Sequence, residues 1–147
     1  MEILKAKIED LEAIKALEDK CFKHPYSKKD LEYEMFENPV ANFLILKENG
    51  EIAGFIDYWI TFDSSTVAQI CVDTKYRRKG LATSLAKYMI DDLKRNEVLA
   101  STLEVRKSNI EAQSFYKSLG YYQVVVKENY YVDGEDAIYM LLEVVNV

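Results

Sequence analysis

The segment TVAQICVDTKYRRKGLATSL, residues 66–85, constrains the fold more than any other stretch of the chain. It reads as an apolar strand, a short basic turn, a glycine and the first turns of a helix. The first backbone N–H groups of a helix have no partner within the helix, and the helix dipole adds partial positive charge there. Gly80 lets the backbone approach a ligand closely because it has no side chain. The segment therefore predicts either a binding site for an anion such as a pyrophosphate, or a basic surface turn that caps the helix.

Basic side chains lead into this glycine and small side chains follow it: Arg77, Arg78 and Lys79, then Ala82 and Thr83. The cations supply an attractive field for an anion, and the small residues leave room for it. The chain has neither the GxxxxGK[ST] pattern of a P-loop nor a GxGxxG dinucleotide pattern. The pattern that is present, Arg77-x-x-Gly80-x-Ala82, resembles the [Q/R]-x-x-G-x-[G/A] loop of the GCN5-related N-acetyltransferases, the GNAT family. In that family the loop holds the pyrophosphate of acetyl-CoA.

The resemblance implies a set of cofactor contacts and a distinctive sheet. In the family, the strand before this loop splays away from the next parallel strand, and its backbone pairs with the pantetheine arm of the cofactor. Ile70, Cys71 and Val72 would supply those backbone groups, whereas the residues alone indicate only an apolar strand in which Cys71 fills the core. The resemblance assigns the remaining cofactor contacts to Asn109 and to the loop residues Arg78, Lys79, Gly80, Leu81, Ala82 and Thr83.

A second group of candidate residues lies in LEVRKSNIEAQSFYKSLGYY, residues 103–122. Alternation along the strand places Glu104 on the face opposite to Leu103 and Val105. Tyr116 lies late in the helix that follows. Because a strand–turn–helix unit folds back on itself, the Glu104 and Tyr116 side chains could converge on one cleft.

Acetyl transfer from a thioester to an amine requires a base, hydrogen-bond donors for the oxyanion, and an acid for the departing thiolate. Glu104 could be the base, directly or through a water, with a pKa raised by partial burial. Tyr116 could be the acid, because a phenol is protonated at neutral pH. Each residue also has a simpler interpretation, since strand glutamates are usually solvated or salt-bridged and helical tyrosines usually belong to the core. The residues alone leave both interpretations open.

The same segment resembles the LEVRxSNxxAxxxYxxLGF motif of the RimI branch of the GNAT family, whose members are ribosomal-protein-alanine N-acetyltransferases. HPYS, residues 24–27, resembles the HPWS-like or FPWS-like segment on their substrate side. ENYYVDGEDAIYM, residues 128–140, resembles their C-terminal RxxYYxxxxEDAxxM hairpin. The resemblance implies roles for four residues: Glu104 as proton acceptor, Tyr116 as proton donor, and Tyr130 and Tyr131 as the lining of the peptide channel.

The chain departs from the pattern of this branch at three positions: Tyr26 where Trp is usual, Tyr121 where Phe is usual, and Lys127 near the usual Arg. The two aromatic exchanges keep the ring shape and add hydroxyl groups. They bear on the peptide preference and not on the chemistry.

The periodic segments predict a single domain over residues 1–147 of the α/β class, with a mixed sheet and helices on its faces. The resemblance narrows this to the GNAT acyl-CoA N-acyltransferase fold, a mostly antiparallel sheet with splayed central parallel strands. Capping-box positions are occupied by Ser27 with Asp30 and by Ser108 with Glu111. The expected elements are helices at 8–22, 27–36, 80–95 and 108–120, strands at 1–6, 66–72 and 99–106, and hairpins at 42–60 around Asn49-Gly50 and at 121–145 around Asp133-Gly134.

Composition argues against several classes of partner. The formal net charge is −6, which disfavours nucleic acid and suits a cationic partner. No apolar run approaches membrane-spanning length and the charged N-terminus is not a signal peptide, so we expect a cytoplasmic protein without a membrane partner. His24 is the only histidine, and no metal is expected. Cys21 and Cys71 lie in no metal-binding spacing and are expected to be buried free thiols in a reducing compartment.

Three functions follow from these residues. The first, favoured here, is the transfer of acetyl from acetyl-CoA to the N-terminal α-amine of a protein, as in the ribosomal-protein-alanine type of enzyme. We expect such an enzyme to be a monomer or a weak homodimer. The lower pKa of an α-amine, near 8 against about 10.4 for lysine, favours this acceptor. The second is a GNAT enzyme for a small amine such as a polyamine, an amino acid or an aminoglycoside. The third is a catalytically silent acyl-CoA-binding module, and the presence of both Glu104 and Tyr116 counts against it.

Overall fold

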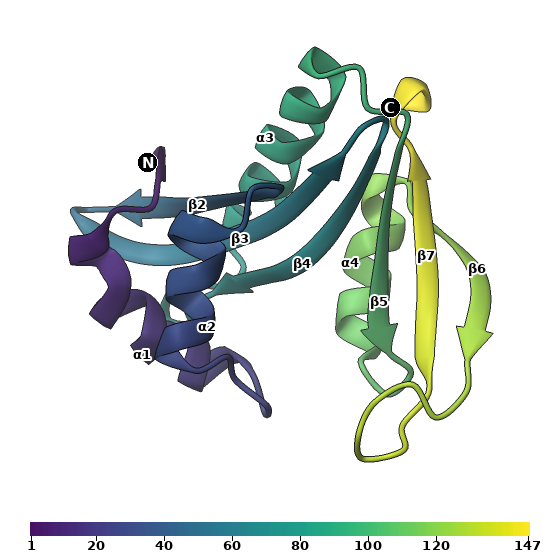
Figure 1. Cartoon of the computed structure of the whole chain (residues 1–147), viewed down its shortest axis with the longest axis horizontal. Coiled ribbons are helices and arrows are strands. Elements are labelled where there is room, and N and C mark those ends of the chain that lie inside the picture. Colours follow the sequence, from purple (N-terminus) through teal and green to yellow (C-terminus); the bar gives the residue numbers. More distant parts are fainter.

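All strands of the chain belong to one mixed sheet of seven strands in the order β1-β2-β3-β4-β5-β7-β6 (Figure 1). The structure, a computed structural model, describes residues 1–147. Every pairing is antiparallel except β4 with β5, which is parallel, so the predicted mixed sheet is confirmed. The strands are β1 (Glu2–Lys5), β2 (Ala41–Glu48), β3 (Glu51–Thr61), β4 (Ser64–Val72), β5 (Ala100–Arg106), β6 (Tyr122–Lys127) and β7 (Ala137–Glu143).

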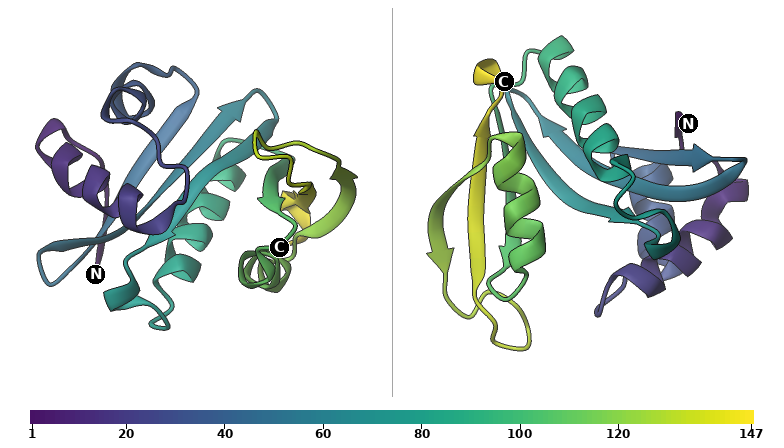
Figure 2. Two further views of the ribbon diagram at one scale, coloured as in Figure 1. Left: turned by 90° about the horizontal axis from the view of Figure 1, so that it is seen from below. Right: turned by 180° about the vertical axis from the view of Figure 1, so that it is seen from behind.

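Helices cover both faces of the sheet. The helices are α1 (Leu11–Cys21), α2 (Lys28–Glu32), α3 (Leu81–Arg95) and α4 (Ile110–Leu119), and a π-helical turn at Tyr33–Glu37 extends α2. α3 and α4 lie on one face, and α1 and α2 lie on the other, against the half of the sheet that contains β2 to β4 (Figures 1 and 2). None of these helices has both the length and the apolar composition that a membrane crossing requires.

Each face of the sheet has its own apolar core. One side of α3, formed by Leu81, Leu85, Met89 and Leu93, is buried in the larger cluster together with residues of β3, β5 and β7. Leu11, Ile14 and Leu17 of α1 are buried in the smaller cluster, against β2 and β3. Burial of these side chains provides the main drive to hold the helices on the sheet, at roughly 1.5–3 kcal/mol for each large residue.

One predicted capping box is confirmed and the other is wrong. At the start of α2, the Asp30 amide donates to Ser27 Oγ at 3.1 Å, and the Ser27 amide donates to an Asp30 carboxylate oxygen at 3.3 Å. At the start of α4 the capping residue is Asn109, whose Oδ1 accepts from the Ala112 amide at 3.1 Å. The box of Ser108 with Glu111 does not form, because the helix begins one residue later than that spacing assumes.

The two hairpins differ in their connections. Asn49 and Gly50 connect β2 directly to β3, and both have positive φ, as predicted for this turn. Asp133 and Gly134 do not form a tight turn between β6 and β7, because the strands end at Lys127 and resume at Ala137. The loop 128–136 has its own internal hydrogen bonds, with the Gly134 amide donating to the Tyr131 carbonyl at 2.8 Å.

The cysteines correct a prediction. Cys21, at the end of α1, and Cys71, in β4, form a disulfide with a Cα–Cα distance of 6.2 Å. The expectation of two free thiols is therefore wrong, and the inference of a reducing compartment loses this support. A separation of 50 residues gives no information about distance in space, and only the packing of α1 against β4 brings the two sulfurs together.

A pair of carboxyl groups is buried beneath the π-helical turn. Asp57 of β3 is fully buried, and burial, followed by the neighbouring Glu34, raises the pKa of Asp57 to about 10. Although burial opposes it, hydrogen bonds from Asp57, Asn38 and Trp59 hold the pKa of Glu34 below its usual value. The pair therefore carries one proton, on Asp57, at neutral pH.

Replacing Asp57 by Asn should stabilise the protein at about pH 8. The unfolded carboxyl loses its proton near its ordinary pKa of about 4, whereas the folded one keeps it until about pH 10, so the wild-type free energy of unfolding falls as pH rises between these values. Asn has no such proton to lose and still offers an N–H to Glu34. Urea unfolding should give the variant an advantage of at least about 1 kcal/mol at the higher pH, shrinking toward pH ~4. An advantage that does not change with pH would contradict this assignment.

Candidate active site

The site begins where β4 and β5 stop pairing. Their parallel register covers only the pairs from Ser64 with Ala100 to Thr66 with Thr102. Beyond them the two strands diverge, as Figure 1 shows, while β4 stays paired with β3 and β5 with β7. A register shift in the β3–β4 ladder leaves Ala68 without a partner at this point, and such bulges bend the strand that carries them. The inner edges of β4 and β5 therefore line a wedge, and two pockets occupy it.

The first pocket has a volume of about 680 Å³ and lies between the end of β4, the basic turn and the starts of α3 and α4. It contains every residue that the sequence assigned to the cofactor except Lys79. The residues brought together are Ile70, Cys71, Val72, Arg78, Gly80, Leu81, Ala82, Thr83 and Asn109.

The backbone amides of the turn have no acceptor within the protein. None of the N–H groups from Arg78 to Thr83 donates to a backbone or side-chain oxygen, and the first intrahelical bond runs from the Ser84 amide to the Gly80 carbonyl at 3.0 Å. Positive φ angles of 63° at Arg78 and 74° at Gly80 turn the chain so that these amides lie around the start of α3. Such an array of free N–H groups at a helix start fits a diphosphate.

The basic side chains have different positions. Arg78 lines the pocket. The Lys79 ammonium lies 5.6 Å from the centroid of the Tyr76 ring and its residue does not line the pocket. Arg77 lines the pocket and its Nε donates to the Val72 carbonyl at 3.3 Å, which ties the turn to the end of β4. The Val72 carbonyl thus has a partner in the protein, a detail that the sequence did not reveal.

The second pocket has a volume of about 770 Å³ and contains both Glu104 and Tyr116. It lies between β4, β5, α4, the α1–α2 connection and the loop 128–136. Six residues line both pockets, so the two form one continuous wedge: Cys21, Phe22, Ile70, Asn109, Ala112 and Phe115.

Glu104 is half-buried and ion-paired. Its Oε1 accepts from the Lys127 ammonium at 2.8 Å, and the alternation of β5 keeps it on the face opposite to Leu103 and Val105, which are buried in the core. The hydrogen bond from Lys127 to Glu104 raises the pKa of the Lys127 ammonium. Lys127 also lies 4.5 Å from the centre of the Tyr139 ring. The ion pair with Lys127 thus fixes the orientation of the Glu104 side chain.

Tyr116 lines the second pocket although it is almost fully buried. The residue is 8% exposed and its ring packs edge-on against Tyr121 at 5.5 Å between centroids. Burial raises the pKa of the Tyr116 phenol well above its usual value, and the hydroxyl makes no hydrogen bond within the chain. The phenol is therefore protonated at neutral pH and free to donate.

The two tyrosines expected to line the substrate channel, Tyr130 and Tyr131, differ in position. Tyr131 lines the second pocket, and the Arg106 guanidinium carbon lies 4.0 Å from the centre of the Tyr131 ring. Tyr130 is half-exposed, lines neither pocket and contacts the edge of Tyr131. Glu135 anchors this loop by accepting from Arg106 at 2.8 Å and from the Ser108 amide at 2.9 Å, and these bonds lower the pKa of Glu135 to about 2.

Three residues of the wedge were not assigned to the site from the sequence. Gln69 lies on β4 itself and donates to the buried Glu18 carboxylate at 2.9 Å. Cys21 and Phe22 come from the end of α1 and reach the site because α1 packs against β4. In the described chain no three His, Cys, Asp or Glu side chains come together as a metal-binding group.

Comparisons with known proteins agree with this geometry. The chain is 37% identical over 138 residues to the [ribosomal protein bS18]-alanine N-acetyltransferase of Escherichia coli strain K12, covering 92% of each chain. A crystal structure of the ribosomal-protein-S18-alanine N-acetyltransferase from Escherichia coli superposes with a TM-score of 0.88 at 34% identity, over 97% of this chain and 93% of that one. The PaiA N-acetyltransferase from Thermoplasma acidophilum, solved in complex with coenzyme A, shares the fold with a TM-score of 0.83 at 22% identity, over 97% and 98% of the chains.

A family description covers nearly the whole chain. The family model described as "Acetyltransferase (GNAT) domain" matches residues 6–144, which include both pockets and all the candidate site residues. The relatives in Escherichia coli match over 92% of this chain in sequence and 97% in structure. The chain therefore belongs to the GNAT family of acetyl-CoA-dependent N-acetyltransferases.

Proposed function

We propose that this enzyme transfers acetyl from acetyl-CoA to the N-terminal α-amine of a protein, with ribosomal protein bS18 as the first candidate acceptor. The observation that carries the proposal is the continuous wedge, with free backbone amides in one pocket and Glu104 with Tyr116 in the other. The relatives named as bS18-alanine N-acetyltransferases support the choice of acceptor.

The first pocket would hold the cofactor. Acetyl-CoA supplies an acetyl group activated as a thioester. The amides from Arg78 to Thr83 would donate to its diphosphate, and the Arg78 side chain adds charge there. The free inner edge of β4 at Ile70 and Cys71 would pair with the amides of the pantetheine arm, and Asn109 lies where the pockets join.

Glu104 would accept a proton from the incoming ammonium group, directly or through a water. Lys127 orients this carboxylate while its other oxygen stays available, since the ion pair uses Oε1. Tyr116 would give its phenolic proton to the departing thiolate, because burial keeps that phenol protonated.

The acceptor is an α-amine on energetic grounds. With a pKa near 8, an α-amine costs roughly 1.4 kcal/mol to hold neutral at pH 7, whereas lysine with a pKa near 10.4 costs roughly 4.6 kcal/mol. Glu104, the single carboxylate proposed as the base, is already paired with Lys127 and suits the acceptor that is cheaper to deprotonate. The second pocket also has room for several residues of a peptide, and its loop is anchored by Arg106 and Glu135 rather than open.

A panel of acceptors tests the proposal. The purified enzyme is given acetyl-CoA with short peptides that have free N-termini, including the bS18 N-terminal sequence, with the same peptides blocked at the N-terminus, and with polyamines. We expect turnover of the free peptides, fastest for bS18, and none of the blocked ones. Turnover confined to polyamines would replace the proposal with a small-amine acetyltransferase.

Changing Gly80 to Ala should weaken acetyl-CoA binding. A Cβ here meets no protein atom within 4 Å, so it would project into the space where the diphosphate is expected. We expect the KM for acetyl-CoA to rise by about tenfold, or ~1.4 kcal/mol of binding. The matched control is Gly50→Ala in the β2–β3 turn, where φ is 80° and a Cβ is equally unobstructed. Both variants should lose about 1 kcal/mol of stability, and an equal rise of KM in both would exclude a special role for Gly80.

Changing Glu104 to Gln, or Tyr116 to Phe, should remove proton transfer while leaving binding intact. Each substitution keeps the shape of the side chain, and we expect kcat to fall by about 100-fold or more. Acetyl-CoA affinity, measured by calorimetry, should stay within about twofold of the wild type, because neither group lies in the amide-rich pocket. If either variant turns over at the wild-type rate, the role given to that residue is wrong.

A further inference from the structure

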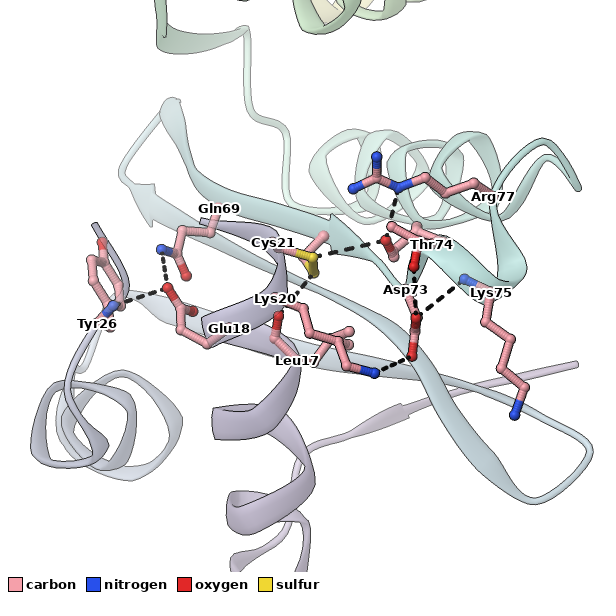
Figure 3. Close-up of a disulfide and its surroundings, with 12 residues drawn as sticks. Leu17, Glu18, Lys20, Cys21, Tyr26, Gln69, Asp73, Thr74, Lys75 and Arg77 are labelled. Atoms are coloured by element: carbon pink, nitrogen blue, oxygen red, sulfur yellow. Dashed lines mark hydrogen bonds and ion pairs between the residues drawn. A yellow bond between two sulfur atoms is a disulfide. The ribbon is translucent and has the colours of Figure 1, made fainter. Parts of the chain in front are cut away.

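The Cys21–Cys71 disulfide lies inside the wedge. Figure 3 shows it between the end of α1 and β4, close to Leu17 and to the turn that carries Arg77. Cys71 is buried, with 4% of its surface exposed, whereas Cys21 is partly exposed. Of the two cysteines, Cys21 is therefore the more accessible to a molecule in the wedge.

The position of Cys21 in the wedge is distinctive. Cys21 lines both pockets and Cys71 lines the first, so the disulfide lies where the amide-rich pocket meets the pocket of Glu104 and Tyr116. If the cofactor binds as proposed above, its diphosphate lies at the start of α3 and its arm runs along Ile70 to Val72 toward Glu104. The thiol at the end of that arm then passes the Cys21 sulfur.

We propose that this disulfide is an exchange site for the thiol of coenzyme A, which forms a covalent adduct on Cys21. This inference rests on the cofactor site proposed above. Binding the diphosphate raises the effective concentration of the thiol beside the disulfide, as for any tethered reactant. Free coenzyme A is the product of the acetyl transfer, so the enzyme generates the reactant itself.

The exchange balances without another oxidant or reductant. The coenzyme A thiolate attacks Sγ of Cys21, a new S–S bond forms between them, and the Cys21–Cys71 bond breaks. Cys71 leaves as a thiolate and takes up the proton that the coenzyme A thiol released. As a thiol it lies 3.8 Å from the Leu17 carbonyl oxygen, within reach of a weak S–H hydrogen bond.

The adduct would block the enzyme reversibly. A coenzyme A molecule bound through Cys21 fills the first pocket and excludes acetyl-CoA from it. The free Cys71 thiol can attack the mixed disulfide, restore the original bond and release coenzyme A. High free coenzyme A therefore favours the blocked form, and its removal favours the active form.

Pantetheine provides the decisive comparison, because it has the same thiol and arm as coenzyme A but lacks the nucleotide diphosphate. The oxidised wild-type protein is incubated with equal concentrations of each, and intact mass is followed without reductant. We expect one coenzyme A per chain, located on Cys21 by peptide mapping and formed at least about tenfold faster than the pantetheine adduct. Acetyl transfer should be lost with the same time course and return after addition of dithiothreitol. The Cys71→Ser variant, which has no disulfide to exchange, should form no adduct.

Desulfo-coenzyme A, which lacks the thiol, separates the two proposals. It should bind the wild-type protein in calorimetry and slow the adduct. If it binds but coenzyme A reacts no faster than pantetheine, or modifies Cys71 instead, the exchange site is wrong and the proposed function stands. If desulfo-coenzyme A does not bind, the cofactor site and the exchange site are both wrong.

Discussion

The short parallel contact between β4 and β5 sets the shape of the sheet and the position of both pockets. Three pairs of residues hold the strands together, and beyond Thr66 and Thr102 each strand keeps a partner only on its outer side. Unpaired backbone N–H and C=O groups are costly when they are shielded from water. The divergence therefore leaves the facing edges of β4 and β5 unpaired beyond these residues, and α3 and α4 pack on one face of the sheet beside them (Figure 2).

The electrostatic character of the wedge is set by local ion pairs and backbone amides, and not by the net charge of the chain. The chain has a net charge of −6, but the turn before α3 presents Arg78 and a row of free amides to the first pocket. In the second pocket Glu104 and Glu135 each have a cationic partner, Lys127 and Arg106. An acidic protein can thus present charge of opposite sign in neighbouring pockets, because partly buried charges act over a few ångströms and are weakly screened there. The function proposed above requires such an arrangement.

Much of this could be read from the sequence where the signal is local. The Asn49-Gly50 turn, the Ser27–Asp30 cap and the helix that follows Gly80 each depend on residues within a few positions of one another, and each formed as expected. The predicted N-cap of α4 was wrong by one residue. Ser108 and Asn109 are both good capping residues, and spacing alone could not choose between them. The sequence predicted a tight turn between β6 and β7, because Asp133-Gly134 is a common turn pair. The longer loop is held instead by Glu135, which accepts hydrogen bonds from Arg106 and the Ser108 amide.

The family, the basic turn with Gly80 and the candidate catalytic residues could all be read from the order of the amino acids, because these are properties of neighbouring residues and of motifs. The folded chain was needed to establish that the cysteines form a disulfide, that Lys127 pairs with Glu104, and that Tyr131 but not Tyr130 lines the pocket. Each of these depends on which strands and helices pack together and on the direction of a side chain at the contact. Such contacts join residues that are far apart in the chain, and no local pattern records them.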